Sequence, residues 1–245
     1  MELEDIIRRS KRIVFFGGAG VSTASGIPDF RSTDGLYNAG TGADGGRPGP
    51  SPEDILSATY FALHTKEFYD FYRAHMVYPD AQPNACHRYL YELEKQDKLR
   101  AIVTQNIDGL HQAAGSRTVF ELHGSVMRNF CMRCRVPYSL DEMLSAREES
   151  GDGIPSCSVC GSIIKPDVVL YEEGLDMNVL SGAIDAIERA SLLVIAGTSL
   201  VVNPAASLIH YFHGDHLAIV NLSPTSADRL ADLVIAEPVG KVFDF

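Results

Sequence analysis

The chain has 245 residues with a formal net charge of −11 at pH 7, and 45% of its residues are apolar and 22% charged. These proportions are ordinary for a folded globular protein and leave little room for extended disorder. The length exceeds one usual domain, so we expect one α/β core with a smaller satellite. The negative charge repels a phosphate backbone and no basic patch offsets it, so no direct nucleic-acid partner is expected.

Neither a membrane partner nor a secretory leader is predicted. No stretch approaches 18 uninterrupted apolar residues. Residues 1–10 are acidic and amphipathic, where a signal peptide is basic and then apolar. Four of the five cysteines form two close pairs and Cys86 stands alone, which favours a metal site in a reducing compartment over disulfides. We therefore expect a cytoplasmic protein.

Strands and helices are predicted to alternate along most of the chain. An amphipathic helix over 2–10 precedes an apolar strand over 13–16 that ends in glycines. Helical periodicity follows at 66–76 and at 83–95, with Pro83 at the first helical position of the second. Further short apolar runs predict strands at 101–104, 119–122, 168–170, 192–196, 216–220 and 233–235. This alternation indicates a mainly parallel sheet covered by helices.

Two segments interrupt the alternation. Residues 30–57 are rich in Gly, Pro, Asp and Ser without an apolar period, which predicts a long loop near a ligand. Residues 126–166 contain the paired cysteines and many polar residues, so we expect an inserted module there, with a small helix over 141–150.

The paired cysteines predict a zinc site. Cys131 and Cys134 form one C-x-x-C pair, and Cys157 and Cys160 form another. Two such pairs converge on one tetrahedral ion, and four thiolates leave no open position for water or substrate, so the zinc is expected to be structural. Two unrelated reduced pairs or a redox couple are the alternatives.

The turn after the first strand is a candidate phosphate-binding loop. Residues 17–22 read GGAGVS and offer backbone amides, and the N-terminus of the helix expected to follow, to a diphosphate. Thr23 stands where the dinucleotide fingerprint has its third glycine, and no ribose-binding acid follows at a strand end about 20 residues later. A hydride-transfer dehydrogenase is therefore poorly supported. On the alternative interpretation, the glycines only allow a tight turn.

Several segments resemble, in order, the signature of the sirtuin family. They are residues 18–31 (GAGVSTASGIPDFR), 104–111 (TQNIDGLH), 121–124 (ELHG), the four cysteines, and 197–200 (GTSL) with 203–205 (NPA). The resemblance runs from the first strand to Asn221. It implies a Rossmann-like large domain over 1–29, 83–125 and 167–245, a cofactor-binding loop and helical part over 30–82, and a zinc-ribbon module over 126–166. A cleft between the domains would bind NAD and an acylated lysine of a protein or peptide.

The resemblance also assigns roles to individual residues. His123 would be the general base, with Asn106 beside it in the catalytic machinery. Substrate would contact Val168, Val169, Tyr171 and Val202. NAD would contact Gly18, Ala19, Gly20, Thr23, Asp29, Phe30, Arg31, Gln105, Asn106, Asp108, Gly197, Thr198, Ser199 and Asn221.

The chemistry that this resemblance implies suits a histidine. A neutral imidazole accepts a proton near working pH, as removal of an acyl group from lysine requires. Taken alone, a histidine at a strand end, such as His123, is more often a structural group. ADP-ribosyl transfer and a non-catalytic nucleotide-sensing zinc module are the alternative functions.

Two departures from the sirtuin pattern bear on specificity. Sirtuins commonly carry Phe-Gly-Glu where this chain has Tyr171-Glu172-Glu173, so a carboxylate replaces the glycine beside an expected peptide strand. Its charge would favour basic residues next to the modified lysine. Members that remove acidic acyl groups carry a tyrosine and an arginine three residues apart, and residues 68–76 lack that pair. Neutral acyl groups are therefore the expected substrates.

Overall fold

The computed structural model describes residues 2–29, 35 and 49–243. The predicted cofactor contacts Phe30 and Arg31 lie outside the described residues, as does most of the predicted loop. In the part that is described, no helix is long and apolar enough to cross a membrane.

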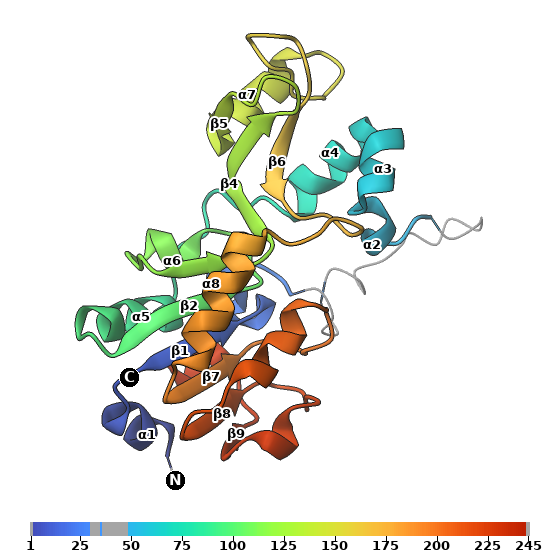
Figure 1. Ribbon diagram of the computed structural model, residues 1–245. Helices are drawn as coiled ribbons and strands as arrows, with labels where there is room; N and C mark the ends of the chain where they lie inside the picture. Colours follow the sequence, from blue (N-terminus) through green and yellow to red (C-terminus); the bar gives the residue numbers. More distant parts are fainter. Residues whose placement is uncertain (1, 30–34, 36–48, 244–245) are drawn as a thin grey trace.

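A six-stranded parallel sheet forms the larger part of the molecule (Figure 1). Its order is β3-β2-β1-β7-β8-β9, and each neighbouring pair is parallel. The order reverses at β1 and β7, where a doubly wound sheet opens a crevice at the carboxyl ends of its strands. This confirms the predicted Rossmann-like fold. The strands are β1 (Ile13–Gly17), β2 (Leu99–Thr104), β3 (Val119–Glu121), β7 (Leu192–Ala196), β8 (His216–Val220) and β9 (Leu233–Ile235).

Both faces of this sheet are covered because its central strands are apolar on both sides. Phe15 of β1 packs on one face and Phe16 on the other, and both are fully buried. The first face is covered by α1 (Leu3–Arg9), α5 (Ala85–Lys95) and α9 (Val239–Val242). The second face is covered by α8 (Met177–Glu188), which crosses the sheet in Figure 1, and by the 3-10 helix Ala205–Tyr211. The short helix α6 (Leu110–Ala113) lies against α5 on the first face, where His111 contacts Phe15, and the 3-10 turn Asp228–Leu230 follows the buried Ala227 on the second face.

A small antiparallel sheet lies beyond the large one. It has the order β5-β4-β6, with β4 (Gly124–Cys131), β5 (Pro137–Ser139) and β6 (Ile164–Val168). Helix α7 (Leu140–Glu149) begins at a capping box between Ser139 and Glu142. Figure 1 places this unit at the opposite end of the molecule from the chain termini.

A third packed unit lies beside β6 and consists of α2 (Pro52–Ile55), α3 (Ala58–Leu63) and α4 (Thr65–His75) (Figure 1). Phe68, Tyr69 and Tyr72 of α4 are buried and pack with Ile164 of β6 in one apolar cluster. The hydroxyl of Tyr69 donates to the backbone C=O of Ile164 at 2.5 Å. The α4 helix thereby attaches this unit to the small sheet.

Three local predictions were wrong. The run 168–170 does not join the parallel sheet, because β6 ends at Val168 and pairs antiparallel with β4. Pro83 precedes α5, because Asn84 accepts the N–H of Cys86 at 3.0 Å and is the N-cap. The glycine-rich turn leads into two 3-10 turns, Ala19–Val21 and Thr23–Ser25, where an α-helix was expected.

Candidate active site and metal centre

Two loops touch at the point where the strand order reverses. The N–H of Gly20, after β1, donates to the C=O of Gly197, after β7, at 2.9 Å. A Cβ on Gly20 would lie 2.7 Å from the Cα of Gly197, which itself has a φ of +59°. A Cβ on Gly18 would lie 2.7 Å from the Cβ of Thr198. These glycines therefore allow the two loops to come into contact. The alternative interpretation, in which the glycines only allow a tight turn, does not account for this contact.

A cavity of about 1030 Å³ opens beside these loops and reaches to the small sheet and α4. It brings together most of the predicted site. The lining includes Ala19, Gly20, Thr23, Asp29, Gln105, Asn106, Asp108, His123, Val168, Val169, Tyr171, Gly197, Thr198, Ser199, Val202 and Asn221. Gly18 is not part of the lining and contacts the Gly197–Thr198 turn behind it.

A hydrogen-bonded chain of side chains forms one polar wall of the cavity. The amide of Asn106 donates to the Ser22 hydroxyl at 3.1 Å, and that hydroxyl donates to Asp108 at 2.7 Å. Asp108 also accepts the N–H of Leu110 at 2.9 Å. Burial raises the pKa of Asp108, and these two bonds oppose the rise. Ser22, which is 1% exposed, was given no role from the sequence, although it lies within the family-like run.

The sequence predicted His123 at the end of a strand. The structure places it in the turn between β3 and β4, two residues after β3 ends at Glu121. Its Nδ1 is 3.0 Å from the backbone C=O of Gln105. A carbonyl only accepts, so Nδ1 carries the proton and Nε2 keeps its lone pair in the neutral ring. Burial lowers the pKa of His123, and the bond to Gln105 partly opposes this. The imidazole is therefore neutral near pH 7 and able to take up a proton.

Gln105 connects this histidine to the nucleotide loops. Its N–H donates to the C=O of Gly17 at 3.0 Å, and its side-chain amide donates to Thr198 Oγ1 at 3.1 Å. Asn221, at the end of β8, donates from its side chain to the C=O of Ser223 at 2.7 Å. Gln105 is thus held by bonds to the two nucleotide loops, and Asn221 by a bond within its own loop at the carboxyl end of β8.

Three of the predicted substrate residues, Val168, Val169 and Tyr171, lie on the segment that runs from the end of β6 toward α3, whereas Val202 lies in the loop after β7. Val169 donates its N–H to the C=O of His123 at 3.0 Å. Tyr171 donates to the C=O of Leu56 at 3.0 Å, and its own C=O accepts the N–H of Ala58 at 3.0 Å. Glu172 follows with a φ of +75°. Its carboxylate accepts a hydrogen bond from Thr59. The expected preference for basic residues next to the modified lysine of the substrate stays a prediction.

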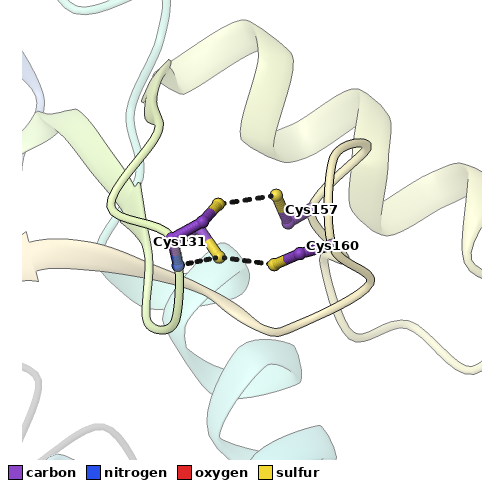
Figure 2. Close-up of side chains that lie close together, drawn as sticks. Cys131, Cys157 and Cys160 are labelled. Carbon is purple, nitrogen blue, oxygen red and sulfur yellow. Dashed lines mark hydrogen bonds between the residues drawn. The ribbon is translucent and has the colours of Figure 1, made fainter.

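Four cysteines converge at the end of the small sheet. All four sulfurs lie within 4.8 Å of one another, and Figure 2 shows those of Cys131, Cys157 and Cys160 facing each other. The Sγ atoms of Cys131 and Cys160 are 3.4 Å apart, and those of Cys134 and Cys157 are 3.6 Å apart. A tetrahedral zinc with Zn–S bonds of about 2.3 Å needs sulfurs about 3.8 Å apart, so the cluster fits one such ion. A hydrogen bond from the Tyr138 hydroxyl lowers the pKa of Cys157 to about 6, which favours the thiolate that zinc requires.

Together these features define a Rossmann-like nucleotide-binding protein with a small four-cysteine module. The sequence model of the Sir2 family matches residues 18–204. The chain is 54% identical to an NAD-dependent protein deacetylase of Clostridium perfringens, over 98% of this chain and 95% of the relative. It is 50% identical to the enzyme of the same description from Cutibacterium acnes, over 98% and 94% of the two chains. The chain belongs to the Sir2 family, which confirms the sirtuin resemblance.

Solved structures agree with this assignment. A Sir2 protein with a deacetylated p53 peptide and 3′-O-acetyl ADP-ribose superposes with a TM-score of 0.88 at 36% identity, covering 99% of this chain and 96% of that one. A Sir2 protein bound to a propionylated peptide superposes with a TM-score of 0.83 at 37% identity, covering 98% of this chain and 93% of that one.

Replacing Cys157 with Ser is expected to unfold the small sheet and remove bound zinc. Structural zinc supplies about 10–16 kcal/mol of apparent folding free energy in small zinc domains, and the remaining ligands cannot close the site. Metal analysis together with amide exchange of β4 and β6 checks this. Cys86→Ala, in the buried core far along the chain from the cluster, should keep one zinc per chain. A folded, zinc-free Cys157→Ser protein would contradict the structural role.

Proposed function

We propose that this chain is an NAD-dependent protein lysine deacetylase that releases nicotinamide, the free lysine and O-acyl-ADP-ribose. The observation that carries the proposal is the neutral imidazole of His123, fixed through Nδ1 to Gln105 on the wall of the large cavity. The named activity of the two bacterial relatives supports it.

The residues of the chain divide the work between binding and proton transfer. NAD, when bound, supplies the ribose carbon that takes the acyl oxygen as nicotinamide leaves. The loop residues Ala19, Gly20 and Thr23, with Gly18 behind them, would hold its diphosphate. Gly197, Thr198, Ser199 and Asn221 would hold the adenosine half, and Asp29, with Phe30 and Arg31, the nicotinamide end. His123 would accept a proton at Nε2.

The wall formed by Gln105, Asn106 and Asp108 would position the ligand beside that histidine. Asn106 is an uncharged donor and acceptor in a partly buried site where an unpaired charge would be costly. The acyl-lysine peptide would bind along residues 168–172, which we call the docking segment, with Val202 across from it. Backbone pairing of this kind depends little on peptide sequence.

Two other functions use the same cavity. ADP-ribosyl transfer to an acceptor requires the same electrophilic carbon but no second-stage base, and a nucleotide-sensing module requires no turnover. The fixed tautomer of His123 favours deacetylation over both. Nicotinamide release measured with and without an acetylated peptide separates the three, since only the deacetylase releases it together with free lysine.

His123→Ala is expected to lower peptide-dependent nicotinamide release and deacetylation by roughly two to four orders of magnitude, the scale of a lost general base. Zinc content and thermal unfolding should stay close to wild type, because His123 is partly exposed and outside the apolar clusters. Deacetylation at near wild-type rate would remove His123 from this role.

The acid limb of the pH profile for kcat/KM should have its midpoint below the ordinary imidazole value of about 6.5. The neutral imidazole is the active form, and burial lowers the pKa of His123. The active form is therefore complete at pH 7 and is lost as the pH falls through that lowered pKa. Steady-state rates between pH 5 and 9 check this. A midpoint above the ordinary value would mean that another group controls the limb.

The lining of the cavity favours neutral acyl groups. It includes Asp141, Glu172 and Glu173, and among the described residues it contains no lysine or arginine. Arg73 of α4 is half exposed and pairs with Glu148 at 3.5 Å, while Tyr72 beside it contributes to the lining. A carboxylate on the acyl group would lose hydration there without gaining a cation.

Deacetylation should exceed desuccinylation by at least about tenfold in kcat/KM, which corresponds to about 1.4 kcal/mol. The measurement uses one peptide carrying acetyl-, butyryl-, succinyl- or malonyl-lysine. Arg73→Ala is the control and should leave the acetyl-to-succinyl ratio unchanged. Equal or faster removal of the acidic groups would show that a cation reaches the acyl group.

A further inference from the structure

Glu172 has a backbone conformation that residues with a side chain rarely adopt. Its φ of +75° lies in the left-handed region, where a Cβ is crowded by the backbone. Sirtuins commonly have glycine here, which adopts this conformation without that crowding. The chain therefore keeps the turn but makes it with a residue that requires a compensating interaction.

The compensating interaction is with helix α3. One carboxylate oxygen of Glu172 accepts the N–H of Thr59 at 2.9 Å and its hydroxyl at 2.7 Å. The N–H of Ala58 donates to the C=O of Tyr171 at 3.0 Å. The first N–H groups of a helix have no partner within it. The docking segment thus caps two of these groups in α3, and Ser57 caps the next, that of Tyr60, at 3.1 Å.

The other side of the same turn is held by Glu173. Its carboxylate accepts the N–H of Leu170 at 2.8 Å and the Nζ of Lys165 at 3.2 Å. Lys165 is buried and also donates to the C=O of Val168 at 3.0 Å. Two successive glutamates therefore hold the turn, one against α3 and one against β6.

Some backbone groups of the docking segment remain available to a bound peptide. Within the described part of the chain, no protein group bonds the C=O of Val169 or the N–H and C=O of Glu172. These groups belong to the docking segment, and both residues that carry them line the cavity.

We propose that Glu172 is a positioning residue whose carboxylate latches the docking segment to helix α3, holding the backbone in the shape that pairs with the acyl-lysine peptide. The inference rests on the proposed peptide binding at this segment. A segment held in its binding conformation loses less freedom when the ligand binds. The latch therefore acts on the KM for the peptide and leaves the KM for NAD and kcat nearly unchanged.

Glu172→Ala keeps the Cβ and removes the carboxylate. It should raise the KM for an acetylated peptide about tenfold, equivalent to about 1.4 kcal/mol, with the KM for NAD and kcat within about twofold. Glu172→Gln retains an oxygen that accepts both bonds and should restore the peptide KM to within about twofold of wild type. Thr59→Val should raise the peptide KM less than Glu172→Ala does. Adding Thr59→Val to Glu172→Ala should have no further effect on the peptide KM, since the two substitutions remove the same interaction.

Glu142→Ala is the matched control. The Glu142 carboxylate also caps a short helix on the small sheet, accepting the N–H of Ser139 at 2.7 Å, but it lies outside the docking segment. Its loss should leave the peptide KM unchanged. An unaltered peptide KM in Glu172→Ala, an equal rise in the KM for NAD, or the same effect from Glu142→Ala would overturn the proposal.

Amide exchange in the absence of substrate tests the latch apart from the activity. The N–H of Thr59 should exchange faster in Glu172→Ala than in wild type and return toward wild type in Glu172→Gln, while the amides of α7 stay unchanged. Unchanged exchange at Thr59 overturns the latch. Absence of peptide-dependent nicotinamide release from wild type would instead refute the proposed function, whatever the exchange result.

Discussion

The site depends on the close approach of the loops that follow β1 and β7. Parallel strands bring their carboxyl ends to one edge, and the Gly20 N–H bond to Gly197 joins the two loops there. Only residues without a Cβ allow this distance. The position of Thr198, and through it the Gln105 side chain, follows from that contact. The backbone N–H of Gln105 bonds the C=O of Gly17 at the end of β1, and its backbone C=O bonds His123, so the proposed base is held beside these same loops.

The fold class could be predicted from the sequence because its evidence is periodic. Apolar runs of strand length between helical patterns indicate a parallel sheet wherever they occur, and five of the runs proposed for it, together with the first strand, formed that sheet. The run 168–170 failed because its composition suits either kind of sheet and only tertiary bonds decide between them, here Val169 to His123 and Tyr171 to Leu56. The metal cluster was predictable because each C-x-x-C pair is local and four thiolates have one common geometry.

The finer features of the site depend on contacts between residues far apart in the chain. Ser22 lies in a run that the family resemblance covers, yet its bond to Asp108 joins positions 86 residues apart. The tautomer of His123 depends likewise on a carbonyl 18 residues away. Replacement of glycine by Glu172 was visible in the sequence, but the partner of its carboxylate, Thr59, lies 113 residues earlier and has no pattern that identifies it.

His123 bonds in two directions at once, and this has a mechanical consequence. Its ring bonds the Gln105 carbonyl at the edge of the large sheet, while its own carbonyl bonds the N–H of Val169 at the end of the small sheet. His123, the proposed base, is thus hydrogen-bonded to both sheets. A tilt of one sheet against the other would strain one of these two bonds, so the imidazole couples the spacing of the two sheets to the shape of the cavity that it lines.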